Sequence, residues 1–195
     1  MINTVNVKTY TDITVDMNEI LRYSQCFDCD NKVANLVREL LKECGFSYKL
    51  CYREFPVEHS GDSIDLGFYK TNSRSLEKLL EKCDRVVLFA ATIGFDIDRR
   101  ITKFSKIDPA KALILQAIGT ERIESLCDAF QEDLKRENGY IITHRFSPGY
   151  ADLPLDMQKE VFRVLNCYKN IGVTLNDSLL MSPSKSVTAI IGIQG

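Results

Sequence analysis

The residues with the clearest chemical potential lie in one hexapeptide, RFSPGY, which begins at Arg145. Arg145 follows a predicted strand, and a guanidinium can hold a carboxylate through two parallel hydrogen bonds. Pro148 favours extended backbone at Ser147, so the amide and carbonyl of Ser147 are expected to face a ligand. Gly149 lets a flat group approach the backbone, and Tyr150 offers an aromatic face or a hydroxyl. The segment suits an amino acid joined to a planar heterocycle; a surface arginine beside an ordinary Pro-Gly turn is the alternative.

The motifs of common self-contained enzymes are missing from the sequence. It has no GxG, which excludes the dinucleotide-binding fingerprint, and it has no GxxxxGK[ST], GxSxG or HExxH. No set of acid, base and nucleophile can be assembled from the remaining residues. The sequence therefore favours a binding role and leaves open whether the protein is an enzyme.

The composition indicates a single globular domain over residues 1–195. The chain is 45% hydrophobic and 27% charged, which suits one sizeable core. Its 25 basic and 27 acidic residues give a formal net charge of −2, so nucleic acid is a poor partner. No apolar run approaches the ~20 residues of a membrane span, and the first residues lack the pattern of a signal peptide. We therefore expect a cytoplasmic protein with no membrane contact.

Seven cysteines are scattered along the chain, which is unlike a secreted disulfide framework. Cys26 and Cys29 form a CxxC pair, but no second pair stands at the spacing of a structural zinc site. The two histidines, His59 and His144, are far apart in the sequence. We therefore expect structural thiols and no metal site, with a metal or redox role of Cys26 and Cys29 as the alternative.

Hydrophobic periodicity alternates between helix and strand along the chain. Amphipathic spacing predicts helices over 31–43, 73–83, 94–104, 109–137 and 152–165. Alternating or continuous apolar runs predict strands over 47–57, 85–92, 140–145, 172–175 and 187–193. A further strand over 62–69 is expected to pair with 47–57. The pattern predicts an α+β fold, a twisted antiparallel sheet flanked by helices.

Three further segments resemble the same known family as the hexapeptide does. They are EILRY from Glu19, DLPL from Asp152 and IGVTLNDSLLMSPSKSVTAII over 171–191. Together with RFSPGY they resemble the activation domain of cobalamin-dependent methionine synthase, and similarity extends over 86–98 and 112–134. The likeness spans nearly the whole chain, is most specific over 140–193, and suggests the stand-alone form of that domain. The resemblance implies the activation-domain fold and a binding site for S-adenosylmethionine.

The resemblance also implies roles for residues of the hexapeptide and of the long helix. In the family, the arginine of this motif holds the methionyl carboxylate, which assigns that role to Arg145. Backbone groups at Ser147 and Gly149 would contact the adenine. An acidic residue of the long helix would contact the ligand's ammonium group. Counting back from Arg145 assigns this contact to Asp128. Glu124, one turn away on the same face of the helix, is the alternative.

Three further positions complete the site that the resemblance implies. Glu19 is the candidate for an acidic contact near the N-terminus. Tyr150 closes the hexapeptide and is a candidate binding residue through its aromatic face or its hydroxyl. Ile191 stands where some family members have an aromatic residue that contacts the ligand, so this chain departs from the family pattern there.

The implied function is the reductive reactivation of cobalamin held by a methionine synthase on another chain. Cob(II)alamin would accept an electron from a flavodoxin-type donor, and cob(I)alamin would take the methyl group of S-adenosylmethionine. Neither histidine stands in the DxHxxG motif of a cobalamin module, so cobalamin is expected only through the partner. A non-catalytic scaffold for a corrinoid methyltransferase, without ligand binding, is the alternative. An independent methyltransferase is a third possibility, for which no activating base can be named.

Overall fold

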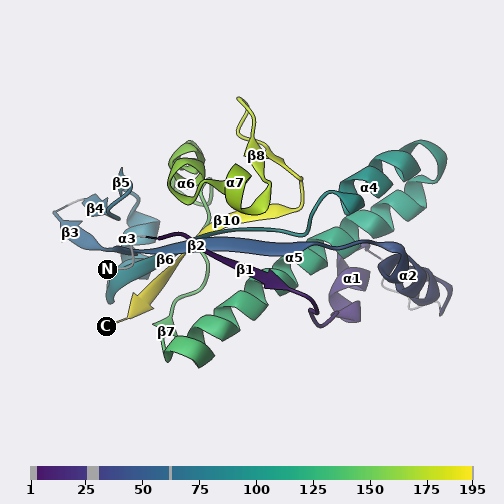
Figure 1. Ribbon diagram of the computed structural model, residues 1–195, viewed down its shortest axis with the longest axis horizontal. Coiled ribbons are helices and arrows are strands. Elements are labelled where there is room, and N and C mark those ends of the chain that lie inside the picture. The colour runs from purple at the N-terminus through teal and green to yellow at the C-terminus, as the bar shows by residue number, and fades with distance from the viewer. Residues whose placement is uncertain (1–3, 26–30, 62, 195) are drawn as a thin grey trace.

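The computed structural model describes residues 4–25, 31–61 and 63–194. Its central sheet has five strands in the order β1-β2-β6-β10-β7, and every neighbouring pair is antiparallel. The strands are β1 (Asn6–Tyr10), β2 (Tyr48–Pro56), β6 (Cys83–Thr92), β10 (Ser186–Gln194) and β7 (Ile141–Ile142). The predicted α+β fold, an antiparallel sheet flanked by helices, is confirmed (Figure 1).

Seven helices surround this sheet within the described residues. They are α1 (Met17–Tyr23), α2 (Asn31–Glu43), α3 (Arg74–Leu80), α4 (Asp96–Ile107), α5 (Pro109–Asn138), α6 (Met157–Leu165) and α7 (Cys167–Ile171). Short strands form two small sheets, one from β3 (Glu58–Ser60), β4 (Ser63–Asp65) and β5 (Lys70–Thr71), the other from β8 (Thr174–Leu175) and β9 (Met181–Ser182). Over the described ranges, no helix has the length and apolar content that crossing a bilayer requires.

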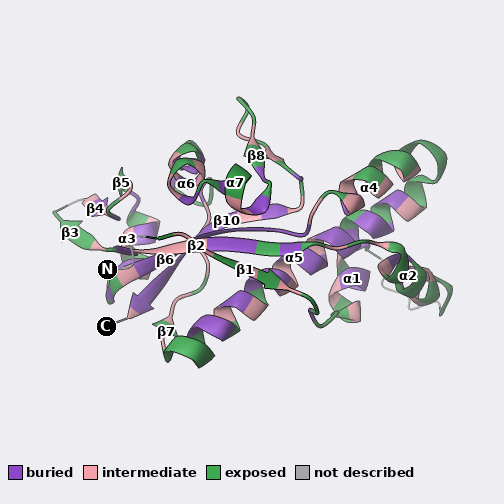
Figure 2. Ribbon diagram, viewed as in Figure 1, coloured by how far each residue is buried: buried purple, intermediate pink, exposed green. Residues whose placement is uncertain are grey.

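Strand β6 is apolar on both faces because both faces of the sheet are covered. Residues Val87, Phe89 and Ala91 pack in the cluster that includes α5, while Val86, Leu88 and Ala90 pack in the cluster that includes α3, α6 and α7. Figure 2 shows this strand and β10 buried along most of their length. Each large side chain buried this way contributes roughly 1.5–3 kcal/mol. The sheet is therefore the rigid layer between the two halves of the core.

Helix α5 is the longest element and extends from α4 to β7 along one face of the sheet (Figure 1). Asp108 caps its start by accepting a hydrogen bond from the amide of Lys111 at 3.0 Å, and Gly139 ends it in the left-handed conformation. Gly119 allows a close approach in the middle of the helix, since a Cβ there would lie 2.9 Å from Cε of Lys185. The helix can therefore pack closely against the turn before β10.

One strand prediction is wrong in its pairing. The segment 63–69 does not pair with β2, which pairs with β1 over Tyr48–Tyr52 on one side and with β6 over Lys49–Pro56 on the other. Instead, β4 pairs with β3 and β5 in a separate three-stranded sheet. The CxxC pair, Cys26 and Cys29, lies outside the described residues.

Other boundaries differ from the prediction near the candidate site. The strand expected over 140–145 is hydrogen-bonded as a strand only at Ile141 and Ile142, and a single bridge then pairs Phe146 with Ile190. Helix α6 begins at Met157 and not at residue 152, because a series of turns follows the Pro-Gly bend. Helices α1 and α7 and strands β1, β3, β5 and β9 were not predicted.

Gly192 of β10 provides a test of how tightly this sheet is packed. A Cβ at Gly192 would lie 2.6 Å from both Sγ of Cys83 and Cδ2 of Leu80. We expect Gly192→Ala to destabilise the fold by about 1–3 kcal/mol through overpacking. Urea unfolding followed by circular dichroism measures the loss. Gly45→Ala is the control, since a Cβ there meets nothing closer than 3.9 Å, and an equal loss in both variants would contradict the packing argument.

Candidate functional site

One face of α5 carries four polar residues at the helical spacing i, i+3, i+4 and i+7. These residues face α1 and, with three residues at the start of α1 and along it, line a cavity of about 240 Å³. The lining residues are Asp16, Glu19, Tyr23, Glu121, Glu124, Ser125 and Asp128. Three acidic residues singled out in the sequence, Glu19, Glu124 and Asp128, therefore lie around one cavity.

Arg145 reaches the same face of α5 from the segment that follows β7. Its guanidinium forms an ion pair with Glu124 at 2.8 Å and a second ion pair with Asp128, and it also donates to the side-chain oxygen of Gln131. The Arg145 side chain is 20% exposed. Phe146, the next residue, packs in the core on the opposite face of the sheet. Because neighbouring side chains of an extended segment point to opposite faces of the sheet, Arg145 points to the face that α5 covers.

The charges around Arg145 keep it protonated. Burial acts to lower the pKa of its guanidinium, but the hydrogen bond to Asp128 and the negative charges of Asp128 and Glu124 outweigh burial and raise that pKa. The cation and the two anions that the sequence singled out are therefore in contact with each other. The family resemblance assigns each of them to a ligand group and does not predict this direct pairing.

The Pro-Gly bend is a tight turn with internal hydrogen bonds. The amide of Gly149 donates to the carbonyl of Leu153 at 2.9 Å, and the amide of Tyr150 donates to the carbonyl of Ser147 at 3.1 Å. Gly149 has φ +83°, a left-handed conformation that favours glycine. The prediction of a turn is confirmed, but the Gly149 amide and one lone pair of the Ser147 carbonyl are already used within it.

Tyr150 and Ile191 differ sharply in exposure. The Tyr150 ring is 64% exposed and packs edge-on against Phe146 with the ring centroids 5.3 Å apart. Ile191 is fully buried in the core cluster beneath α5 and has no surface to offer a ligand. Its assignment to the site is therefore corrected: Ile191 is a core residue, because its position in β10 points inward toward α5.

Asp152 ties the turn to helix α3. Its carboxylate accepts a hydrogen bond from the Ser73 hydroxyl at 2.5 Å and from the Arg74 amide at 2.8 Å, which caps the start of α3. The Ser73 hydroxyl and the amides at the helix start lower the pKa of Asp152 to about 2. The turn is thereby held at one end by Asp152 and at the other by Arg145.

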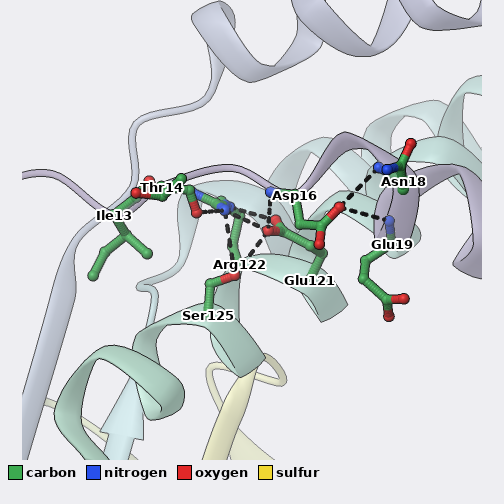
Figure 3. A network of polar contacts seen from close by, with 8 residues as sticks. All are labelled: Ile13, Thr14, Asp16, Asn18, Glu19, Glu121, Arg122 and Ser125. Carbon is green, nitrogen blue, oxygen red and sulfur yellow. Dashed lines mark hydrogen bonds and ion pairs between the residues drawn. The ribbon is translucent and has the colours of Figure 1, made fainter. Parts of the chain in front are cut away.

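A second charged group of α5 holds the connector between β1 and α1 (Figure 3). Arg122 donates to the carbonyls of Ile13 at 2.7 Å and Thr14 at 2.6 Å, and Glu121 accepts from the amide of Asp16 at 2.8 Å. Neither Glu121 nor Arg122 was among the site residues predicted from the sequence. The spacing of Glu121, Glu124, Ser125 and Asp128 is the signal that would have found Glu121.

The comparisons with known proteins agree with this architecture. The family model described as "Vitamin B12 dependent methionine synthase, activation domain" matches residues 70–194. The chain belongs to this family. The matched range contains Arg145, Glu124 and Asp128 but not Glu19, which lies N-terminal to it.

A solved structure, the crystal structure of the MetH reactivation domain bound to AdoHcy, has the same fold. It superposes with a TM-score of 0.71 at 15% identity and covers 98% of this chain and 78% of that chain. No match was found among curated proteins. The activation-domain fold therefore extends over the N-terminal part of the chain, which the family model does not cover.

The next feature is the distribution of residues that could bind a metal ion. Within the ranges that the structure describes, no three His, Cys, Asp or Glu side chains are grouped so that they could hold a metal ion. Of the cysteines there, Cys51, Cys83, Cys127 and Cys167 are buried and Cys44 is partly buried. Cys26 and Cys29 lie outside the described residues.

The cap by Asp152 predicts how stability changes with acid. Because the pKa of Asp152 is lowered from 3.8 to about 2, its stabilising contribution is full above 3.8 and is lost as the pH falls toward 2. We expect Asp152→Asn to make unfolding free energy less dependent on pH in this window. Ser73→Ala should raise the Asp152 pKa toward its ordinary value, as carboxyl NMR titration would measure. An Asp152 that titrates near 3.8 in the unsubstituted protein would contradict the cap.

Proposed function

We propose that this domain binds S-adenosylmethionine in the cavity between α1 and α5 and presents its methyl group to cobalamin held by another chain. The observation that carries the proposal is the contact of one guanidinium, Arg145, with two carboxylates of the cavity lining, Glu124 and Asp128. Arg145 itself and the residues of the Pro-Gly bend are not among those that line the cavity, so the ligand would extend from the cavity past Arg145 to the bend. Membership of the activation-domain family supports the same ligand class, and so does the AdoHcy in the solved relative.

The charges of the ligand match those of the site. S-adenosylmethionine carries a carboxylate, an ammonium and a sulfonium group. Its carboxylate would replace Glu124 and Asp128 as the partner of Arg145, and its ammonium would bind the carboxylates released. Every charge stays paired in this exchange, which matters because an unpaired charge removed from water is expensive. Glu19, 40% exposed and paired with Arg22, adds a negative charge from the α1 side.

The nucleoside would lie against the Pro-Gly bend. Each backbone carbonyl has two lone pairs, so the Ser147 carbonyl keeps one acceptor site for the adenine amino group. Gly149 is exposed, but Leu155 Cδ1 fills the place of its missing side chain, since a Cβ there would lie 2.9 Å from it. A flat ring would therefore lie against the open side of the Gly149 backbone, and the exposed face of Tyr150 adds apolar contact area. The binding residues of the proposal are therefore Arg145, Ser147, Gly149, Tyr150, Asp128, Glu124 and Glu19.

The proposed chemistry needs no catalytic base from this chain. The methyl group would move from the sulfonium to reduced cobalamin, which is the nucleophile, and the thioether AdoHcy would remain. A flavodoxin-type protein would supply the electron that reduces the cobalamin. The contribution of this chain is orientation of the methyl donor, which can itself supply much of a rate advantage.

One observation favours a second candidate function. Arg145 already has three side-chain partners on α5, so a ligand must break these contacts before it binds. A domain in which they never break would keep the fold and serve as a scaffold for a corrinoid methyltransferase. Ligand binding and partner binding therefore need separate measurements.

Arg145→Ala tests the proposed carboxylate contact. We expect isothermal titration to show S-adenosylmethionine binding by the unsubstituted protein and a loss of about 2–4 kcal/mol in the variant, because a hydrogen-bonded charge pair is lost. Arg163→Ala is the control, since Arg163 pairs with Glu160 on α6 at 2.7 Å and does not line the cavity. Unchanged affinity in Arg145→Ala refutes the contact, and no binding by the unsubstituted protein refutes the proposed function.

A methyl-transfer assay separates the two candidate functions. The domain is mixed with a cobalamin-loaded methionine synthase, a reductant and S-adenosylmethionine labelled in its methyl group. We expect label on the cobalamin only when the domain is present, and much less with Arg145→Ala. A domain that is co-purified with the synthase but transfers no label would be the scaffold.

A further inference from the structure

The most deeply buried charges in the described residues belong to two neighbours on α5, Glu121 and Arg122. Both are only 1% exposed, and their side chains form an ion pair. Removing a charge from water costs free energy, so buried charges in proteins are paired and hydrogen-bonded. Their remaining hydrogen bonds therefore indicate what the pair does.

Those hydrogen bonds go to the connector that leads into α1. Arg122 donates to the carbonyls of Ile13 and Thr14, and Glu121 accepts from the amide of Asp16 at 2.8 Å. Glu121 also accepts a hydrogen bond from Ser125, one turn along α5, at 2.8 Å. Figure 3 shows the connector residues meeting both side chains. The pair thus fixes backbone that is more than a hundred residues away in sequence.

A second set of hydrogen bonds connects the fixed connector to the start of α1. The carboxylate of Asp16 accepts from the amides of Asn18 at 2.9 Å and Glu19 at 3.1 Å, which caps the helix (Figure 3). A helix of seven residues is too short to be stable alone, so its position depends on such contacts and on the burial of Ile20 and Leu21. Glu19 is therefore linked to Glu121 through one residue, Asp16.

The pair also sets the charge of the cavity. Glu121 lines the cavity, but its charge is matched by the adjacent Arg122. The cavity has four other carboxylates. Asp16 caps α1, Glu19 pairs with Arg22, and Glu124 and Asp128 pair with Arg145. A cationic ligand would therefore meet Glu19 on α1 and Glu124 and Asp128 on α5 by exchange with these arginines. The separation of Glu19 from the two carboxylates of α5 depends on where the connector places α1.

We infer that Glu121 and Arg122 form a positioning unit for the ligand site, which holds α1 so that Glu19 faces the carboxylates of α5. The position of α1 is independent of any ligand, and only the effect of that position on affinity rests on the proposed binding of S-adenosylmethionine. Neither residue is a catalytic residue; each acts through the connector and through Asp16.

The positional part is tested without ligand. The double variant E121L/R122M replaces the pair by apolar side chains of similar volume and removes the partners of the Ile13 and Thr14 carbonyls and of the Asp16 amide. The control is K8M/D133L, which removes the ion pair that joins β1 to the same helix at 2.9 Å. We expect the amides of residues 17–23 to exchange hydrogen about tenfold faster in E121L/R122M than in the control. Equal exchange in the two would overturn the inference.

The functional part is tested by titration with S-adenosylmethionine. Arg122→Lys keeps the charge beside Glu121 but places all its donors on one atom, so it cannot reproduce the contacts that Arg122 makes through three separate nitrogens. Arg100→Lys is the matched control, since Arg100 likewise joins a carboxylate, Asp96, and a backbone carbonyl, that of Glu43, but away from the cavity. We expect about tenfold weaker binding in Arg122→Lys and unchanged binding in Arg100→Lys, because a less ordered wall must be fixed on binding.

A third comparison separates positioning from a merely structural role. Glu19→Gln should weaken binding in the unsubstituted protein and have little further effect in Arg122→Lys, since Glu19 is then no longer held in place. Additive effects, or unchanged affinity in Arg122→Lys, would overturn the inference. If the unsubstituted protein binds no S-adenosylmethionine, the proposed function fails, whereas hydrogen exchange still decides whether the pair positions α1.

Discussion

The guanidinium of Arg145 lies against the face of α5 that carries Glu124 and Asp128, and the candidate site depends on this contact. A partly buried cation needs a partner, and these carboxylates are the partners within reach. The contact joins the segment before the Pro-Gly bend to a helix from an earlier part of the chain. It therefore determines where the bend lies relative to the cavity, while Asp152 holds the other end of the bend at α3.

Helix α5 serves the core and the site at once. One side of it buries Leu126, Cys127 and Phe130 against the sheet, while the neighbouring side presents Glu124 and Asp128. Because packed apolar side chains fix the rotation of the helix, they also fix the direction of its carboxylates. The site therefore has the rigidity of the core, although most of its charged groups remain partly exposed.

The fold was largely predictable where periodicity is strong. The helices over 31–43 and 109–137 and the strands over 85–92 and 187–193 were predicted close to their observed bounds, because each buries a regular apolar pattern. The pairing of 62–69 was wrong, since pairing depends on which strand edges are free and not on the segment itself. The short α7 was missed because five residues carry too little periodicity to be recognised.

The sequence by itself determined the family, the α+β class and the residues of the RFSPGY bend, because these depend on local order and residue type. Only the tertiary structure decided which of those residues meet. It brought Glu19, Glu124 and Asp128 around one cavity and buried Ile191, whose inward direction follows from the register of β10 against β6. It also paired Arg145 with the carboxylates that the sequence could only assign to a ligand. Contacts across such sequence distances depend on packing of the whole sheet, which no local pattern contains.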